Sequence, residues 1–296
     1  MLKHATLQPP GGTSWRFNLR PLLAALRGGL RAPGLSLSLL FVGLLLLTAL
    51  WPAWLTSADP LAGSARDAFG APSAAHWLGT DENGRDVLAR LCAGARPSLL
   101  LGFAATLVGL AGGVLLGLLA GLGGRWLGAF AARGIDVLMA FPDILLALVV
   151  ITLWGPSLLN GILAIGIGGA PRYARLIGAQ VRQVRQAGYV EAAITLGYPS
   201  LGIVLRHVLP NAIKPVILLA TIAIGHNIGI GATLSFLGFG LPPPTPEWGS
   251  MLSAGRDFLS NAWWLVVAPG VVVTLTVVSM TVIGRTLMRI SEGKRK

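Results

Sequence analysis

The chain has 296 residues, of which 54% are hydrophobic and 11% are charged, and its formal net charge is +12. Soluble domains carry about a quarter charged residues, so this composition excludes an ordinary soluble fold and favours a membrane protein. The charge does not indicate a nucleic-acid-binding protein, because the basic residues do not gather on a folded polar domain.

Six apolar segments are candidates for membrane-spanning helices, for which about 20 residues suffice. The first is preceded by a long polar segment and followed by further spans, so we expect an uncleaved helix and not a signal peptide. The fourth is the weakest, because Gly168, Gly169 and Pro171 interrupt it. The sequence therefore predicts an all-α polytopic membrane protein with six transmembrane helices, at residues 35–55, 98–121, 134–154, 158–176, 212–236 and 264–286.

The distribution of basic residues predicts how these helices are oriented. With six spans and a cytoplasmic N-terminus, 18 basic residues lie on the inner side and five on the outer side, in agreement with the positive-inside rule. Removing the fourth span would move a loop with six basic residues to the outside, so we keep this span. We expect residues 1–34 and the C-terminus in the cytoplasm, and residues 56–97 in an external loop.

The second span carries glycines spaced by four residues, which places them on one helix face. Such a stripe allows another helix to approach closely in the membrane. A shorter version of the pattern occurs in the fifth span, at Gly225 and Gly229. We expect a packing role for the stripe, which consists of Gly109, Gly113, Gly117 and Gly121.

Polar residues within the spans are candidates for the translocation path. In the third span, Asp136 and Asp143 are seven residues apart and lie on nearly the same face of a continuous helix. Asp143 follows Pro142, so it either caps the helix portion after the proline or contacts substrate. In the fifth span, His226 and Asn227 either form an interhelical hydrogen bond or line the path.

The segment at residues 177–211 predicts two short helices on the cytoplasmic side. Residues 188–197 read GYVEAAITLG, with Glu191 near the positive helix end and Gly197 as a left-handed stop. A second helix is expected after Pro199 and is expected to end at Pro210. With Ala192 and Ala193 exposed, the segment either inserts into a groove of another protein or rests on lipid headgroups. The apolar face of the second helix consists of Leu201, Val204, Leu205 and Val208.

This segment resembles the EAA loop of importer permeases of the ATP-binding-cassette superfamily. The family loop ends in an aliphatic residue, any residue, Leu and Pro, so His207 departs from the broad pattern. The run His-Val-Leu-Pro-Asn nevertheless fits the peptide and nickel branch of the family. The resemblance implies that the loop docks on an ATPase subunit through Glu191, Ala192, Ala193, Gly197, His207, Leu209 and Pro210.

Two further motifs resemble the same branch. Residues 76–86 are similar to its HxLGTDxxGRD segment, and residues 235–249 are similar to its SFLGxG and PPTPEWG segments. The resemblance covers about residues 75–285, and the basic C-terminal tail departs from the usual family ending. It implies a type I importer permease fold over residues 35–296. The candidate contacts with an extracytoplasmic binding protein are Asp81, Arg85, Glu247 and Trp248, although simple packing between the fifth and sixth helices is an equal alternative for the last two.

By this resemblance, the chain is a permease subunit of a bacterial importer in the inner membrane. It is expected to pair with a second homologous permease subunit, two ATPase subunits or domains and the binding protein. Di- or oligopeptides are the first choice of cargo. Nickel or a metal chelate is the second, because an Ile-Gly-His run ending at His226 resembles the nickel permeases. A stand-alone secondary transporter or channel and a membrane-embedded scaffold are the alternatives from other classes.

The chain lacks the residue patterns of catalysis. No G-x-x-x-x-G-K-[ST] loop is present to cradle ATP phosphates, so ATP and Mg are expected on the partner ATPases and no cofactor on this chain. The four histidines are scattered, and a single cysteine forms neither an intrachain disulfide nor a metal cluster. We therefore expect no metal site and no enzyme active site.

Overall fold

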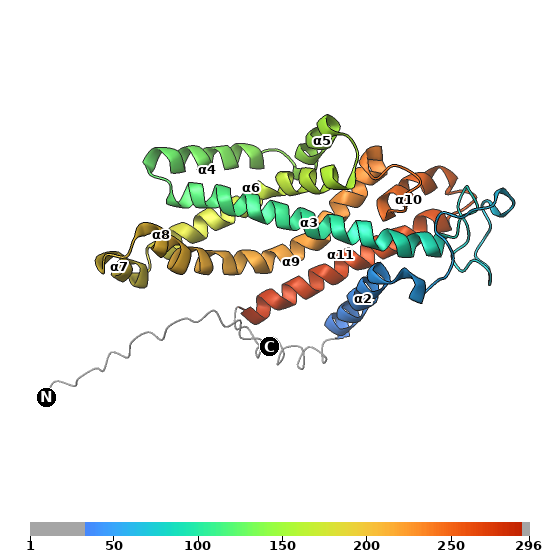
Figure 1. The fold of residues 1–296 in the computed structure, drawn as a ribbon, viewed down its shortest axis with the longest axis horizontal. Coiled ribbons are helices and arrows are strands. Elements are labelled where there is room, and N and C mark those ends of the chain that lie inside the picture. Colours follow the sequence, from blue (N-terminus) through green and yellow to red (C-terminus); the bar gives the residue numbers. More distant parts are fainter. Residues whose placement is uncertain (1–32, 292–296) are drawn as a thin grey trace.

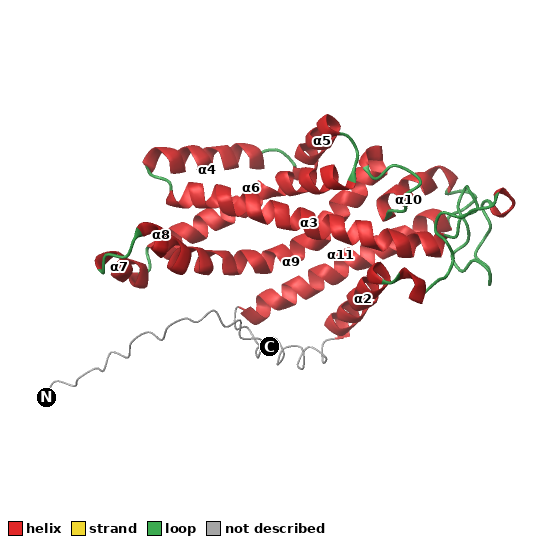
Figure 2. Ribbon diagram, in the orientation of Figure 1, coloured by secondary structure: helices red, strands yellow, loops and turns green. Residues whose placement is uncertain are grey.

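The computed structural model describes residues 33–291. Figures 1 and 2 show a helical molecule whose loops gather mainly at the end that carries residues 51–86. The described part of the chain has no β-strand, only an isolated bridge between Thr80 and Asp86, so the expected all-α class is confirmed. The helices are α2 (Pro33–Leu50), α3 (Val87–Leu122), α4 (Arg125–Met139), α5 (Asp143–Trp154), α6 (Leu158–Arg185), α7 (Gly188–Thr195), α8 (Ser200–Ile203), α9 (Leu209–Leu234), α10 (Trp248–Gly255) and α11 (Trp264–Ser291).

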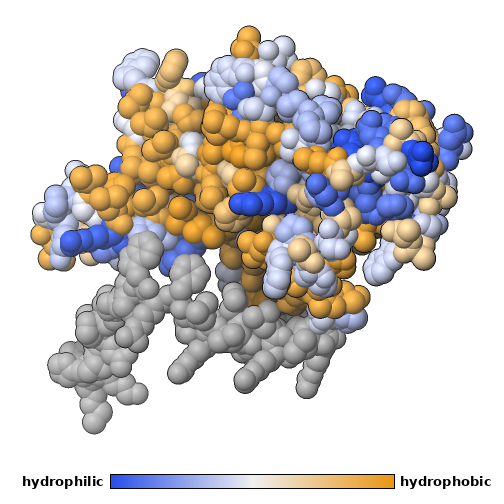
Figure 3. Space-filling model, turned by 45° about the vertical axis from the view of Figure 1, so that its right-hand side comes forward, coloured by the Kyte–Doolittle hydropathy of each residue, from blue (hydrophilic) through white to orange (hydrophobic). Residues whose placement is uncertain are grey.

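Helices α2, α9 and α11 overlap the first, fifth and sixth predicted spans, whereas α3 begins at Val87, within the predicted external loop. Among residues 33–291, four helical stretches are long and apolar enough to cross a membrane: α2, α3, the stretch that contains α9, and α11. Helices α4 and α5 qualify only as a bent pair. Helix α6 has 28 residues, more than the roughly 20 that a span requires, but its second half is basic. Figure 3 shows the resulting surface, with a broad hydrophobic region next to hydrophilic loops.

The third predicted span is broken. Helices α4 and α5 meet at an angle of 90° across residues 140–142, and in Figure 1 α4 lies along α3 whereas α5 turns away from that direction. Pro142 has no N–H group to continue a helix, and its ring disfavours the helical conformation of Phe141. The prediction of one helix over residues 134–154 was therefore wrong, and so was the placement of Asp136 and Asp143 on one face of it.

The fourth predicted span is longer and more regular than expected. Helix α6 continues through Pro171 as far as Arg185. Helix α5 packs against its glycines, because a Cβ added at Gly168 would lie only 2.8 Å from the carbonyl oxygen of Asp143. The loop predicted to begin at residue 177 begins after Arg185. Arg172, which the charge count assigned to the inner side, lies in the middle of the helix.

The glycine stripe of α3 packs against another helix, as predicted, and this helix is α6. A Cβ added at Gly109 would lie 3.0 Å from the carbonyl oxygen of Gly166. A Cβ added at Gly117 would lie 2.7 Å from the carbonyl oxygen of Ala174. The two helix backbones therefore approach each other more closely than any larger side chain permits. Gly225 allows the same close approach between α9 and α11, because a Cβ added there would lie 3.1 Å from the carbonyl oxygen of Val277.

The helix after Pro199 was predicted to end at Pro210, but it continues into α9. Helix α8 passes into a π-helical turn, Val204–Val208, and this turn leads directly into α9. The N–H of Leu209 bonds to the carbonyl of Val204, and the side chain of Asn211 donates to the carbonyl of His207 at 2.7 Å. The wider turn and this side-chain bond compensate for the N–H that Pro210 lacks, so the helix is not broken.

Candidate functional site

The predicted EAA loop forms a helical cap at one end of the molecule, opposite the loops of residues 51–86 (Figure 1). Helix α7 carries Glu191 in its first turn, where the helix dipole favours an acidic side chain. Gly197 follows the helix with a φ of +77°, a left-handed conformation that glycine adopts without steric cost. The two short helices on either side of Pro199 are thus present as predicted.

This cap has a large uncovered apolar surface. Leu196 is 75% exposed and Leu201 is 69% exposed. Clustered large apolar side chains at a surface mark a site of interaction with a protein or a membrane. We define the coupling patch as the exposed apolar residues of this segment, namely Tyr189, Ile194, Leu196, Tyr198, Leu201 and Leu205.

The two alanines of the EAA motif have different surroundings. Ala192 is exposed, as predicted. Ala193 is only 5% exposed and belongs to a hydrophobic cluster with Val190 and with residues of α6 and α9. Its predicted exposure was wrong, because the inner face of a short helix must bury its small side chains to pack against the ends of the long helices.

The last three predicted docking residues lie beneath the coupling patch. The ring of His207 is half-buried, with centroid distances of 6.4 Å to Tyr189 and 6.5 Å to Tyr198. Leu209 and Pro210 are half-buried as well. These residues therefore support the patch from inside and offer little surface of their own.

At the opposite end, residues 76–86 form a compact clasp. Asp81 is 5% exposed, and its carboxylate accepts from Nε of Arg85 at 2.7 Å and pairs with Nε of Arg90 at 3.3 Å. Asp86 caps α3 by accepting from the N–H of Ala89 at 2.8 Å. The acidic residues of this motif thus serve the packing of the loop against the start of α3.

The glycines of the clasp are required by its geometry. Gly79 and Gly84 have φ values of +74° and +72°, which strain other residues. A Cβ at Gly84 would overlap the carbonyl of Ser64. The indole N–H of Trp264 donates to the carbonyl oxygen of Thr80 at 3.1 Å, so the clasp is tied to the first residue of α11.

Glu247 and Trp248 are buried, which corrects their prediction as contacts of a binding protein. They are 3% and 1% exposed. The carboxylate of Glu247 caps α10 by accepting from the N–H groups of Gly249 and Ser250, both at 2.9 Å. The indole N–H of Trp248 donates to the carbonyl of Leu91 at 3.0 Å. Both residues therefore pack the connection between the fifth and sixth predicted spans, which was the alternative to a contact with a binding protein.

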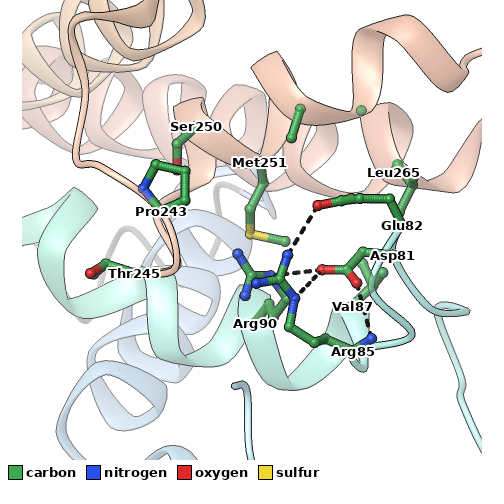
Figure 4. Close-up of a pocket in the computed structure, with 12 residues that line it drawn as sticks. Asp81, Glu82, Arg85, Val87, Arg90, Pro243, Thr245, Ser250, Met251 and Leu265 are labelled. Atoms are coloured by element: carbon green, nitrogen blue, oxygen red, sulfur yellow. Dashed lines mark hydrogen bonds and ion pairs between the residues drawn. The ribbon is translucent and has the colours of Figure 1, made fainter. Parts of the chain in front are cut away.

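A pocket of about 70 Å³ opens beside the clasp. In Figure 4, Glu82 and Asp81 point toward Arg85 and Arg90 on one side, and Met251 of α10 lies on the other. Arg85 also pairs with Glu82, at 3.0 Å. Asp81 and Arg85, predicted as external contacts, are therefore occupied by ion pairs and present little surface to a partner.

Three polar side chains from three helices meet at the break between α4 and α5. Oδ2 of Asp143, the first residue of α5, accepts from Nη2 of Arg172 in α6 at 2.6 Å and lies 3.0 Å from Nε2 of His226 in α9. Oδ1 of Asp143 accepts from the N–H of Ile144 at 3.2 Å. The side chains of Asp143, Arg172 and His226 are 28%, 46% and 43% exposed. We call these three residues the polar triad.

Asn227 lies apart from the polar triad. It is 7% exposed, and its Nδ2 donates to Oγ1 of Thr106 in α3 at 2.9 Å. This is the interhelical hydrogen bond that the structural alternative predicted, so Asn227 does not face an open path in this structure.

Arg172 is the site residue that sequence reasoning missed. It follows Pro171, where the helix was expected to be interrupted, and it was counted as a charge of the inner side. The sequence did contain a signal for a longer helix. No proline occurs between Pro171 and the end of α6, so the sequence was compatible with a helix that continues to Arg185.

Among the described residues, His76 and His226 each pair with one carboxylate, whereas His207 contacts two tyrosine rings. His76 lies 2.9 Å from Asp86, and His226 pairs with Asp143. Within residues 33–291, no group of three or more His, Cys, Asp or Glu side chains is arranged to hold a metal ion.

Known proteins resemble most of this chain in sequence. Residues 113–296 match the family described as binding-protein-dependent transport system inner membrane component. The dipeptide transport system permease protein DppC of Alkalihalophilus pseudofirmus is 39% identical over 87% of this chain and 86% of its own length. The di/tripeptide transport system permease protein DppC of Pseudomonas aeruginosa is 39% identical over 87% of each chain. The glutathione transport system permease protein GsiD of Pectobacterium atrosepticum is 35% identical over 100% of this chain and 95% of its own length.

Solved structures resemble the fold. A chain of the MetNI methionine ABC transporter in inward-facing conformations superposes with a TM-score of 0.55 at 20% identity, covering 70% of this chain and 97% of that one. A chain of an amino acid ABC transporter superposes with a TM-score of 0.54 at 17% identity, covering 68% of this chain and 93% of that one. These likenesses concern the helical architecture alone.

Proposed function

The chain belongs to the family of binding-protein-dependent transport system inner membrane components, and on this premise we propose that di- or oligopeptides cross the membrane through it. Members of the family are permease subunits of ATP-driven importers and act with an ATPase and a binding protein. The peptide cargo is inferred from the two DppC relatives, whose names specify dipeptide and di/tripeptide transport. The binding protein then selects the peptide, and this chain provides part of the route.

We propose that the coupling patch is the surface that docks on the ATPase. The observation that carries this proposal is the exposure of six large apolar side chains in the EAA segment, at the end of the molecule opposite the clasp. A groove on a partner protein would remove these side chains from water, with Glu191 and Ala192 at its edge. ATP and Mg would then be bound by the ATPase, and no residue of this chain would perform covalent chemistry.

The proposed topology follows from the same arrangement. The end with the coupling patch faces the cytoplasm, and the clasp faces the outside. The cytoplasmic position expected for both chain ends concerns residues 1–32 and 292–296, which lie outside the described residues. The excess of basic residues at the inner ends of the spans supports this orientation. Six spans with these termini correspond to α2, α3, the bent pair of α4 and α5, α6, α9 and α11.

We further propose that a second, homologous permease subunit completes the route, with two ATPase subunits or domains below. Two exposed features support a partner beside α4. Trp126 and Phe130 on this helix are 85% and 79% exposed, and the polar triad is partly uncovered at the adjacent break. In the proposed cycle, ATP binding closes the ATPase pair, the coupling patch moves with it, and the spans change between inward and outward openings.

A charge placed in the coupling patch tests the docking proposal. Leu201→Glu should abolish peptide uptake and co-purification of the ATPase, because the interface would have to bury an unpaired carboxylate, while the chain stays at its normal level in the membrane. Leu61→Glu, at a 52% exposed leucine of the outer loop, is the matched control. Retained ATPase binding by Leu201→Glu would contradict the docking role. Peptide transport by the chain alone in liposomes would favour a secondary transporter.

A further inference from the structure

The polar triad lies at the middle of the helical bundle and not at either end. Arg172 is 14 residues from the first residue of α6 and 13 from the last, so it is about 20 Å from each end at 1.5 Å per residue. His226 is 17 residues from the start of α9, a distance of about 25 Å. An arginine, an aspartate and a histidine therefore meet inside the helical bundle, away from both the coupling patch and the clasp.

A partly exposed ion pair in this position requires a polar neighbour. Charged groups in the hydrocarbon core are costly, and they face a protein interior or a water-filled cavity. Arg172 and His226 are 46% and 43% exposed in this chain, so the helices described here do not enclose them. The exposed side of the triad must therefore face the route between this chain and its proposed partner subunit.

Arg172 keeps N–H donors that no residue of the triad uses. Guanidinium carries five N–H donors in a planar fork that matches a carboxylate. Among residues 33–291, Arg172 donates to an oxygen acceptor only through Nη2, to Asp143. Asp143 receives both of its side-chain partners on one oxygen and is only 28% exposed. The available surface of the triad is thus mainly a donor surface, which suits an anion.

We propose that Arg172 binds the terminal carboxylate of the peptide as it passes through the membrane, and that Asp143 and His226 position the guanidinium for this contact. The proposal rests on the proposed function as a peptide permease. In the empty route, Asp143 neutralises the arginine and holds it at the break between α4 and α5. When a peptide arrives, its carboxylate accepts from the unused N–H groups, so the charge of the cargo is compensated at this point of the route.

Two substitutions that break the same ion pair separate this role from a structural one. The complete assembly, with binding protein saturated with dialanine, is reconstituted in proteoliposomes, and the initial rate of ATP-driven uptake is measured. Arg172→Gln should lower the rate about tenfold, because the carboxylate loses its donor; this corresponds to about 1.4 kcal/mol. Asp143→Asn should lower the rate by only about threefold, because it removes the contact that positions the guanidinium but retains the arginine and its donors. Arg175→Gln, one turn further along α6 and 65% exposed, is the matched control and should leave the rate unchanged.

The cargo provides an independent measurement that needs no variant. The unmodified assembly should take up dialanine about tenfold faster than dialanine amide when the binding protein is saturated with either. Equal losses in Arg172→Gln and Asp143→Asn would assign the pair a structural role and overturn the proposal, and so would equal uptake of acid and amide by the unmodified assembly. Absence of any peptide uptake by the unmodified assembly would instead refute the proposed function, and the carboxylate site with it.

Discussion

The close approach of α3 and α6 makes a quantitative prediction for Gly117→Ala. The new Cβ would lie 2.7 Å from the carbonyl oxygen of Ala174 and 2.8 Å from Cβ of Ile177. Ordinary contact begins at 3.4 Å, and neither of these atoms is the end of a flexible side chain. The two helices must therefore separate by about 0.5–1 Å, which forfeits a quarter to a half of the dispersion attraction across the affected contacts.

This separation should lower the free energy of unfolding by about 1–3 kcal/mol, the usual range for an overpacked core. The matched control is Gly112→Ala on the same helix, whose Cβ would meet only Cβ of Ala170, at 3.4 Å. Both variants gain the same helix propensity from alanine, so their difference isolates the clash. Thermal unfolding of the purified assembly should show a midpoint roughly 3–10 °C lower for Gly117→Ala than for the control. Equal midpoints, or a higher one for Gly117→Ala, would refute the requirement for glycine at this contact.

Two further predictions concern the outer end of the molecule. Gly84→Ala should loosen the clasp, because a left-handed conformation costs about 1–2 kcal/mol and the Cβ overlaps the carbonyl of Ser64. Protease cleavage within residues 56–86 should accelerate in reconstituted vesicles, whereas Gly155→Ala, with φ of +83° but open space around its Cβ, should leave it unchanged; equal cleavage would argue against the clasp. Asp86→Ala should remove the cap of α3 and lower the free energy of unfolding by about 1 kcal/mol in a thermal melt. Asp86→Asn should retain most of that stability, and an Asn variant as unstable as the Ala variant would show that capping is not the main contribution.

Local signals in the sequence predicted the parts of the fold that depend on neighbouring residues. Hydropathy located the long helices, and the spacing of Gly109, Gly113, Gly117 and Gly121 identified the packed face of α3 before its partner was known. The left-handed end of α7 at Gly197 follows from the same kind of local rule. These features are determined within a few turns of helix, which explains why they were predictable.

Features that depend on distant contacts were missed. Pro142 breaks a helix and Pro171 does not, although both are prolines in apolar segments. The difference lies in the surroundings, because Pro171 is buried against neighbouring helices and Pro142 lies at an exposed turn. Similarly, Asp143 and His226 were each identified as candidates, but their contact across 83 residues of sequence has no local signal.

The candidate contacts at the outer end show a further limit of motif reasoning. Glu247 and Trp248 belong to a recognisable motif, and a motif with charge and aromatic character invites an interpretation as a binding surface. Their burial at 3% and 1% assigns them to the connection between α9 and α10. A recognisable sequence pattern can therefore reflect a demanding fold, here a capped helix and a buried indole, as readily as a surface for a partner.

The near-continuous helix from Ser200 to Phe239 has a mechanical consequence. Its 40 residues form a lever about 60 Å long, for which a tilt of about 5° at the coupling patch displaces the far end by about 5 Å. That amplitude is comparable to the width of an extended peptide backbone. The helix has a non-helical residue, Gly238 with φ of +93°, only close to its far end. Little of the motion imposed at one end would therefore be absorbed along the helix before it reaches Leu237.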